Sequence, residues 1–477
     1  MKRIVMVVVW SVVMISLLQA EILPISGPVE KLVTEGKWRE AEQIISEQIQ
    51  RSDISFAERQ NLLFQRERMR RIRMDFKNDQ DQTLKIIQGI VPTVDRQQFD
   101  RWDKQGSIES MVIDGQRWFF NRAGQNLFRV NPEARKLKLK HQPASPDEKA
   151  TLKANLHQII DAYHQTAQSL VIPKTYRITY TITVDSGVVP PGETVRAWLP
   201  FPRDGGRQSQ IRLLKTEPEL NIEAGNHRQQ RTLYLENQSI DSKPMVFKAV
   251  FEYTASGFYL PVDPKRVTQV DFETHPELKP WIEERPPHIV FSDTIRSLAK
   301  SIAGQEQNPY LKARSYFKWI NDNVTWASAR EYSTLESICH YPLGGWGDCG
   351  IQTLLFMALC RSQSIPARWQ SGWTTRPPSA GMHDWCQIYI EPYGWLPVDP
   401  SYGLTPDKDK TIEWFFFGNI DSYRLVVNDD YSRELYPVKL FYRSETVDFQ
   451  RGELEYAGGN LYYDQWDWDY KVEEITR

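Results

Sequence analysis

The stretch Gly344-Gly345-Trp346-Gly347-Asp348-Cys349-Gly350 decides the fold, because a strongly apolar helix begins where it ends. The helix is indicated by apolar residues at the i, i+3, i+4, i+7, i+8 spacing of a buried face: Ile351, Leu354, Leu355, Ala358 and Leu359. Apolar and polar residues then alternate through 367–373, 383–390 and 395–399, which predicts antiparallel strands. We therefore expect a buried helix packed on an antiparallel sheet.

Cys349, His383 and Asp399 provide, in that order, a thiol nucleophile, a base and a carboxylate to orient the base. Cys349 stands at the expected helix N-terminus, where exposed N–H groups favour the thiolate and help to hold an oxyanion. Gly347 and Gly350 leave room for a substrate backbone. These residues predict an active site for acyl transfer.

The turn Glu391-Pro392-Tyr393-Gly394 brings His383 and Asp399 toward each other. A four-residue loop with plain register places Cys386 opposite Asp399. Asp399 then falls about three residues short of His383, on the order of 10 Å. We expect a bulge at Pro397, which cannot donate to a ladder, to correct this offset.

Cys360 and Cys386 fall at apolar positions and are expected to be small buried hydrophobes. A zinc site through Cys339, His340 and Cys349 is disfavoured, because the chain has no Cys-x-x-Cys and no His-Glu-x-x-His. We expect no metal and no cofactor.

Residues 1–20 have the pattern of a secretory signal peptide: basic Lys2-Arg3, an apolar run from Ile4 to Leu18, and Ala20 before the expected cleavage. The alternative is a retained anchor, for which the apolar run is short. The mature chain is therefore expected to be extracytoplasmic, in the periplasm, on the cell surface or secreted. Its four cysteines allow at most one disulfide if Cys349 stays a thiol.

Length and charge set further bounds. A chain of 477 residues is expected to hold several domains, and a net charge of −2 gives no reason to expect a nucleic-acid partner. No later stretch is apolar enough to span a bilayer. The oligomeric state is not readable from the sequence.

We predict an α+β multidomain chain. Residues 21–170 form a mainly helical module with helices at Lys37–Ile45 and Ser55–Phe76, which resemble a single tetratricopeptide hairpin without repeats. The module also contains a hairpin at Asp114-Gly115 and a strand-like run at Leu127–Val130. Residues 171–285 form a β-sandwich, 286–410 the catalytic core, and 411–477 a β extension packed on the core or the sandwich.

Five separated motifs between residues 290 and 405 resemble the transglutaminase-like superfamily: Gly347-Asp348-Cys349-Gly350, Leu354-Leu355, Ile365-Pro366-Ala367-Arg368, His383-x-Trp385 and Gly394-Trp395-x-Pro397-Val398-Asp399-Pro400. The resemblance implies a papain-like fold with Cys349 as nucleophile, His383 as base and Asp399 as orienting acid. It also implies an associated N-terminal sandwich containing Trp198-Leu199-Pro200. The layout is similar to that of secreted proteins from Bacteroidetes-type bacteria.

One residue departs from the family pattern, and one functional side chain is not assigned. Ser364 stands where a glycine usually precedes Ile-Pro, and the oxyanion-stabilising side chain is not placed. Candidates for oxyanion or substrate binding are Trp326, Trp346, Gly350 and Trp385. Indoles at 346, 369, 373, 385 and 395 are suited either to a peptide groove or to the core.

A Cys-His-Asp set performs acyl transfer through a thioester, and the acceptor decides the reaction. We favour a cysteine peptidase or amidase that hydrolyses peptide or glutamine-amide bonds of a protein or peptide substrate. The alternatives are a cross-linking transglutaminase, which passes the acyl group to an amine, and an inert cell-surface binding or scaffold protein.

Overall fold

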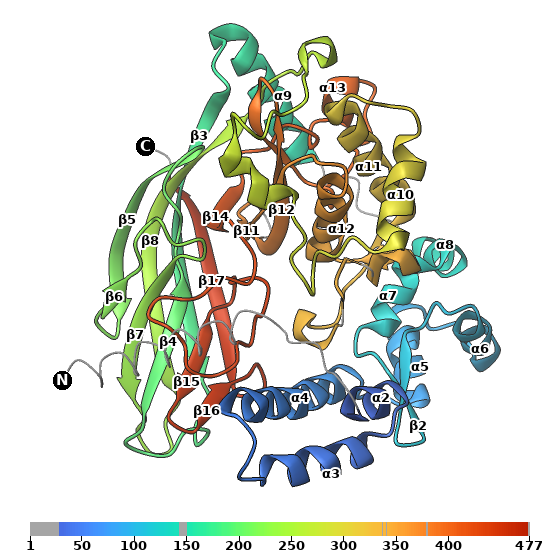
Figure 1. Ribbon diagram of the computed structural model, residues 1–477, viewed down its shortest axis with the longest axis vertical. Coiled ribbons are helices and arrows are strands. Elements are labelled where there is room, and N and C mark those ends of the chain that lie inside the picture. The colour runs from blue at the N-terminus through green and yellow to red at the C-terminus, as the bar shows by residue number, and fades with distance from the viewer. Residues whose placement is uncertain (1–27, 143–149, 336, 340, 378–379, 476–477) are drawn as a thin grey trace. The chain divides into compact units, whose positions relative to one another are not determined.

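The computed structural model describes residues 28–142, 150–335, 337–339, 341–377 and 380–475 (Figure 1). The fold is α+β and multidomain, as predicted from the sequence. The described residues form two compact units, which we call the helical unit (those within Ile22–Pro146 and Asn323–Ile351) and the β-rich unit (those within Asp147–Asp322 and Gln352–Arg477). The predicted signal peptide lies outside the described residues. No helix among those that are described has the length and apolar character needed to cross a membrane.

Helices make up most of the helical unit. They are α2 (Pro28–Thr34), α3 (Trp38–Ile49), α4 (Phe56–Asp75), α5 (Gln80–Ile90), α6 (Arg96–Lys104), α7 (Ala123–Val130) and α8 (Pro132–His141). The predicted helices at Lys37–Ile45 and Ser55–Phe76 correspond to α3 and α4. Ser55 and Glu58 form a capping box that starts α4, because each side chain satisfies the other's backbone N–H. A core with Trp38, Phe99 and Trp102 holds these helices together.

The predicted hairpin is present as β1 (Ser110–Ile113) and β2 (Gln116–Phe119), joined by Asp114-Gly115 with both φ angles positive. The prediction of a strand at Leu127–Val130 is wrong, because these residues form the C-terminal half of helix α7. Ala123, Leu127 and Phe128 are buried on its inner face. A short apolar run is compatible with the period of a strand and with that of a helix. Here Ala123 and Leu127, four residues apart, pack on the same side, which favours the helix.

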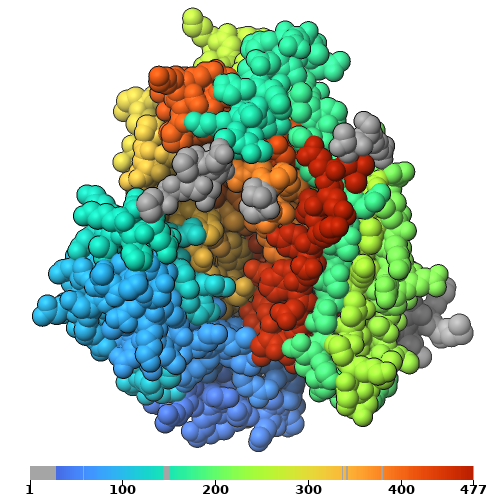
Figure 2. All heavy atoms as spheres, turned by 180° about the vertical axis from the view of Figure 1, so that it is seen from behind, coloured from blue at the N-terminus to red at the C-terminus, as the bar shows by residue number. Residues whose placement is uncertain are grey.

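The β-rich unit contains two sheets that face each other across one core. The first has the order β17-β3-β8-β5 and the second β16-β15-β4-β7-β6. The bounds are β3 (Leu170–Val184), β4 (Thr194–Pro200), β5 (Gln208–Glu217), β6 (Ile222–Glu223), β7 (Thr232–Gln238), β8 (Met245–Phe258), β15 (Glu453–Tyr456), β16 (Gly459–Leu461) and β17 (Trp466–Ile475). Ile178, Ile182 and Trp198 lie in this core. Figure 2 shows β17, in red, beside the green strands of the sandwich.

A third sheet of the β-rich unit has the order β13-β12-β11-β14. Its strands are β11 (Ala367–Thr374), β12 (Gly381–Ile390), β13 (Gly394–Val398) and β14 (Arg424–Asn428). The same unit contains α9 (Ala150–Thr166), α10 (Asp293–Ala303), most of α11 (Pro309–Asn323), most of α12 (Cys349–Arg361), α13 (Lys410–Glu413), η1 (Pro264–Arg266) and η2 (Pro276–Ile282). Trp373 and Leu425 extend the sandwich core beneath this sheet, which joins the two layers into one body.

Short elements complete the helical unit between residues 323 and 351. They are β9 (Thr325–Trp326), η3 (Tyr332–Thr334), η4 (Tyr341–Gly344), β10 (Trp346–Gly347) and the first three residues of α12. The division between the two units thus falls inside α12, after Ile351. This places Cys349 in the helical unit and both His383 and Asp399 in the β-rich unit.

Candidate active site

Cys349 is the first residue of α12 and is partly exposed. The preceding Asp348 caps the helix, because its Oδ1 accepts a hydrogen bond from the Ile351 N–H at 3.1 Å. Gly347 is required two residues before the thiol, since a Cβ there would lie 2.6 Å from Cγ2 of Ile351. The local sequence therefore presents the thiol at a capped helix N-terminus, where the helix dipole favours a thiolate.

The other three cysteines are buried, and none of the four, all of which are described, is in a disulfide. Burial raises the pKa of the Cys360 and Cys386 thiols well above the ordinary value. This agrees with the prediction that both are small apolar side chains. The residues predicted for the buried face of α12, namely Ile351, Leu354, Leu355, Ala358 and Leu359, are fully buried. The structure buries the other residues from 350 to 361 as well, so the helix is enclosed on all sides and has no single inner face.

His383 on β12 and Asp399 just beyond β13 form a buried pair. Nε2 of the imidazole lies 2.8 Å from Oδ2 of the carboxylate. An ionised carboxylate only accepts, so Nε2 must carry the proton that it donates. The other ring nitrogen, Nδ1, is then left with a lone pair, as a general base requires.

The register of the β12–β13 hairpin differs from the expectation. Ile390 pairs with Gly394 and Cys386 with Val398, without a bulge at Pro397. Continued by one residue, this register places Asp399 opposite Trp385, on the same face as His383 two residues away. The expected register would have put Asp399 opposite Cys386, on the other face, because neighbouring side chains alternate. The prediction of a bulge is therefore wrong. A shift of one residue in the pairing of β12 with β13 brings Asp399 to the face of His383 instead.

Asp399 is fully buried and held by several donors. Its Oδ1 accepts backbone N–H bonds from Ser401 at 3.1 Å and Tyr402 at 2.9 Å. Its Oδ2 lies 2.8 Å from Nη1 of Arg424. Burial raises the pKa of Asp399, but His383, Arg424 and the hydrogen bonds together lower it below its usual value. The carboxylate therefore stays ionised beside the imidazole.

Arg424 is a buried partner of this pair that the sequence analysis missed. Its Nε and Nη2 donate to Oδ2 of Asp421 at 3.0 and 2.8 Å, and its pKa is raised because the two carboxylates outweigh the cost of burial. The guanidinium carbon lies 4.3 Å from the ring centroid of Tyr402 and 5.3 Å from that of Trp385. The sequence held a signal for it, because Arg424 directly precedes the apolar run Leu425-Val426-Val427.

Aromatic rings fix the plane of the imidazole. Trp385 stacks on His383 with centroids 5.9 Å apart, and Tyr402 meets it edge-on at 5.0 Å. The Trp385 indole N–H donates to Oε1 of Gln370 at 3.0 Å. Trp385 is fully buried, and the contacts described here support the ring of His383.

Gln450, far along the chain, holds the backbone of His383. Its Nε2 donates to the His383 carbonyl at 3.0 Å and to Oδ1 of Asp384 at 2.7 Å. Its own N–H donates to Oε2 of Glu445 at 2.7 Å. The C-terminal segment thus contacts the strand that carries the candidate base.

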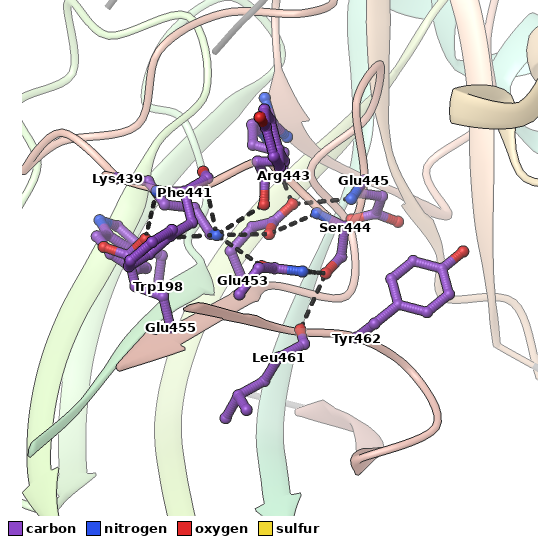
Figure 3. Close-up of polar contacts among 12 residues, drawn as sticks. Trp198, Lys439, Phe441, Arg443, Ser444, Glu445, Glu453, Glu455, Leu461 and Tyr462 are labelled. Atoms are coloured by element: carbon purple, nitrogen blue, oxygen red, sulfur yellow. Dashed lines mark hydrogen bonds and ion pairs between the residues drawn. The ribbon is translucent and has the colours of Figure 1, made fainter. Parts of the chain in front are cut away.

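A buried ion cluster of Lys439, Arg443, Glu453 and Glu455 anchors that segment (Figure 3). Lys439 Nζ lies 3.8 Å from Glu453 and 3.5 Å from Glu455, and Arg443 Nε lies 3.4 Å from Glu453. Glu453 also accepts the N–H groups of Ser444 and Glu445, each at 2.8 Å. Charges buried this deeply need such partners, and their pairing fixes the loop that leads to Gln450.

The remaining candidates lie in the helical unit. Trp346 is partly buried on β10, Gly350 is buried in the first turn of α12, and Trp326 is 36% exposed on β9. Their roles in oxyanion or substrate binding stay predictions. Of the other indoles, Trp369 and Trp373 are fully buried core residues and Trp395 is half-buried. Over the described ranges, no group of three or more His, Cys, Asp or Glu side chains is arranged to hold a metal ion.

Comparison with known proteins finds a family match for one part of the chain. Residues 296–400 match the model of the Transglutaminase-like superfamily. The match contains Cys349, His383 and Asp399. An uncharacterized protein of Haemophilus influenzae is 24% identical over 244 residues, which are 41% of this chain and 59% of that protein.

Two solved structures match parts of this chain at low identity. One, from Cytophaga hutchinsonii, is described as a "Putative Cysteine Protease"; it is 17% identical, with a TM-score of 0.43 over 65% of this chain and 93% of its own. The other, described as a "putative protease" of Parabacteroides distasonis, is 8% identical, with a TM-score of 0.20 over 56% of this chain and 48% of its own.

Proposed function

Residues 296–400 belong to the transglutaminase-like superfamily, and on that premise we propose that the protein transfers acyl groups through a thioester on Cys349. Hydrolysis of peptide or glutamine-amide bonds is the reaction we favour. The observation that carries the proposal is the buried hydrogen bond between His383 and Asp399, 2.8 Å long, which leaves Nδ1 available as a base.

The reaction divides into two steps. In the first, His383 Nδ1 takes the thiol proton, the sulfur of Cys349 attacks the acyl carbon, and the imidazolium returns the proton to the departing nitrogen as the C–N bond breaks. In the second, His383 takes a proton from water, the hydroxide attacks the thioester, and the thiol leaves with that proton. Asp399 stabilises the imidazolium of both steps without being protonated itself.

Within the β-rich unit, Thr353 of α12 contacts the strand that carries His383. Thr353 follows Cys349 by four positions, so the two side chains lie on one face of the helix. The Thr353 hydroxyl donates to the backbone carbonyl of Asp384 at 3.5 Å, next to His383 on β12.

The acceptor and the location are parts of the same proposal. The N-terminal signal pattern supports an extracytoplasmic enzyme, where water is the abundant acceptor. The near-neutral charge supports a protein or peptide substrate over a nucleic acid. Fractionation of cells with an antibody against the chain tests the location, and recovery in the cytoplasm would contradict it.

Mass spectrometry of substrates tests the reaction. The purified chain is incubated with a peptide library rich in glutamine, with and without a primary amine. Cleaved or deamidated peptides support hydrolysis, and amine-labelled peptides show cross-linking chemistry instead. Each product must disappear with Cys349→Ala. A Cys349 thiol with the reactivity of an ordinary cysteine, unchanged by His383→Ala, would overturn the proposal and leave a binding or scaffold role.

A further inference from the structure

Side chains of the helical unit form hydrogen bonds at two separate places with the segment that leads to Cys349. We call these two sets of bonds the first and the second grip. The segment, residues 323–348, contains β9, η3, η4 and β10. Most of it lacks regular secondary structure, and the β9–β10 ladder is two residues long on each strand. A ladder this short is too weak to hold its own geometry, so other contacts must order the segment.

The first grip is made by Asn126 on α7. Its Nδ2 donates to the Ser328 carbonyl at 2.8 Å, and its Oδ1 accepts the Ser328 N–H at 3.0 Å. Asn126 is 5% exposed, so this reciprocal pair satisfies buried polar groups on both sides. Ser328 lies two residues after the end of β9, so the pair fixes the chain just beyond β9 to α7.

The β9 strand passes this constraint to the residues before the thiol. Thr325 pairs with Trp346 and Trp326 with Gly347 in a parallel ladder. The Ala327 N–H also donates to the Gly347 carbonyl at 3.1 Å. Arg129, also on α7, places its guanidinium carbon 4.2 Å from the Trp326 ring centroid. Helix α7 therefore holds β9, and β9 holds the strand that ends two residues before Cys349.

The second grip is made by arginines of α4. Arg71 Nη1 donates to Oγ of Ser333 at 3.1 Å, and Arg68 Nη2 donates to the Thr334 carbonyl at 3.1 Å. Both arginines are buried, at 1% and 6% exposure. They fix η3, whose remaining residue, Tyr332, donates its hydroxyl to Oδ1 of Asp348 at 2.8 Å. That same carboxylate oxygen caps α12 at Ile351.

We infer that the helical unit is a working part of the active site, with Asn126, Arg68, Arg71 and Tyr332 as positioning residues that hold the first turn of α12. Two independent chains of contacts end close to Cys349: the one through β9 and β10 ends at Gly347, and the one through η3 ends at Asp348. This inference rests on the proposed function for its purpose, but the contacts stand by themselves. It assigns a role to a helical module whose sequence suggested only packing.

Hydrogen exchange and thiol alkylation, measured together, test the inference. The variants are Asn126→Ala, which removes the first grip, and the milder Tyr332→Phe, which removes one hydroxyl from the second. The matched control is Arg66→Ala, an exposed arginine on α4. We expect faster exchange in residues 346–351 for both variants, with the helical content unchanged. We also expect the pKa of the Cys349 thiol to rise by about one unit, so that the thiolate fraction below that pKa falls about tenfold.

The outcomes separate this inference from the proposed function. If Tyr332→Phe and a folded Asn126→Ala match Arg66→Ala in both measurements, the inference is overturned. If Asn126→Ala fails to fold, Tyr332→Phe alone decides. If the wild-type thiol already has ordinary reactivity and does not respond to His383→Ala, the proposed function fails. Exchange in residues 346–351 then still decides whether the helical unit orders the first turn.

Discussion

Asp399 and His383 lie on the same face of the β12–β13 hairpin, with Oδ2 and Nε2 2.8 Å apart. The register that pairs Cys386 with Val398 makes this possible. A shift of one residue would turn the carboxylate to the opposite face and leave the buried imidazole without its acceptor. The chemistry of the site therefore depends on a three-residue connection at 391–393, far from the thiol in sequence.

Asp399→Asn is expected to change the tautomer of His383. The amide presents N–H to Nε2, which then accepts, so the proton moves to Nδ1 and the base is lost. The rate of acyl transfer should fall on the order of 10⁴-fold, as when the orienting aspartate of a catalytic triad becomes asparagine. Nitrogen chemical shifts of the imidazole, compared with those of the exposed-site control Asp467→Asn, check the tautomer directly. An unchanged tautomer with full turnover would contradict the assignment.

Arg424→Met is expected to destabilise the β-rich unit by about 3–5 kcal/mol, because it leaves the carboxylates of Asp399 and Asp421 buried with a cation removed. It should also raise the pKa of Asp399, which Arg424 helps to lower. Urea unfolding at neutral pH measures the first effect. Arg212→Met, at a side chain that is 56% exposed, is the control and should cost less than about 1 kcal/mol. Equal losses in the two variants would argue against a special role for Arg424.

The four cysteines should react very differently with iodoacetamide in the folded protein. Cys349 is partly exposed at a helix N-terminus, whereas Cys360 and Cys386 are buried with raised pKa values. Mass spectrometry after brief labelling should find the adduct on Cys349, and Cys349→Ala should abolish it. Labelling of Cys360 or Cys386 at a comparable rate would show that α12 or β12 opens to solvent.

Asp75 should make the stability of the helical unit depend on pH. Burial and the neighbouring charge of Glu331 raise its pKa to about 7. Arg330 lowers this pKa, and Glu109 raises it further. The folded state therefore holds a proton that the unfolded chain releases near pH ~3.9. The stabilisation is complete below that value and is lost as pH rises through about 7, by up to about 1.4 kcal/mol for each pH unit.

Asp75→Asn removes this titration. Urea unfolding at pH values on either side of the two pKa values should show a smaller loss of stability with rising pH in the variant than in the wild type. The same curves for Asp81→Asn, at an exposed carboxylate on α5, provide the control. Parallel curves for the wild type and Asp75→Asn would mean that the pKa of Asp75 is the same in the folded and unfolded states, which would contradict this prediction.

The parts of the fold that follow from local pattern were predictable. Helix α12, the α3 and α4 pair and the β1–β2 turn each depend on the period of apolar residues or on turn chemistry within about twenty positions. The order Cys349, His383, Asp399 was readable for the same reason, since each residue stands within a short motif. The strand expected at 127–130 failed because its apolar run was too short to distinguish the two periods.

The amino-acid sequence by itself determined which residues have the chemistry of acyl transfer and which helix and strands carry them. The tertiary structure alone decided the hairpin register, the burial of Arg424 beside Asp399, the contact of Gln450 with His383, and the grouping of residues 323–351 with the N-terminal helices. The reason is physical: these features join residues up to 266 positions apart, as Arg68 and Thr334 are. The free energy of such contacts comes from burial and pairing that no local window of sequence contains.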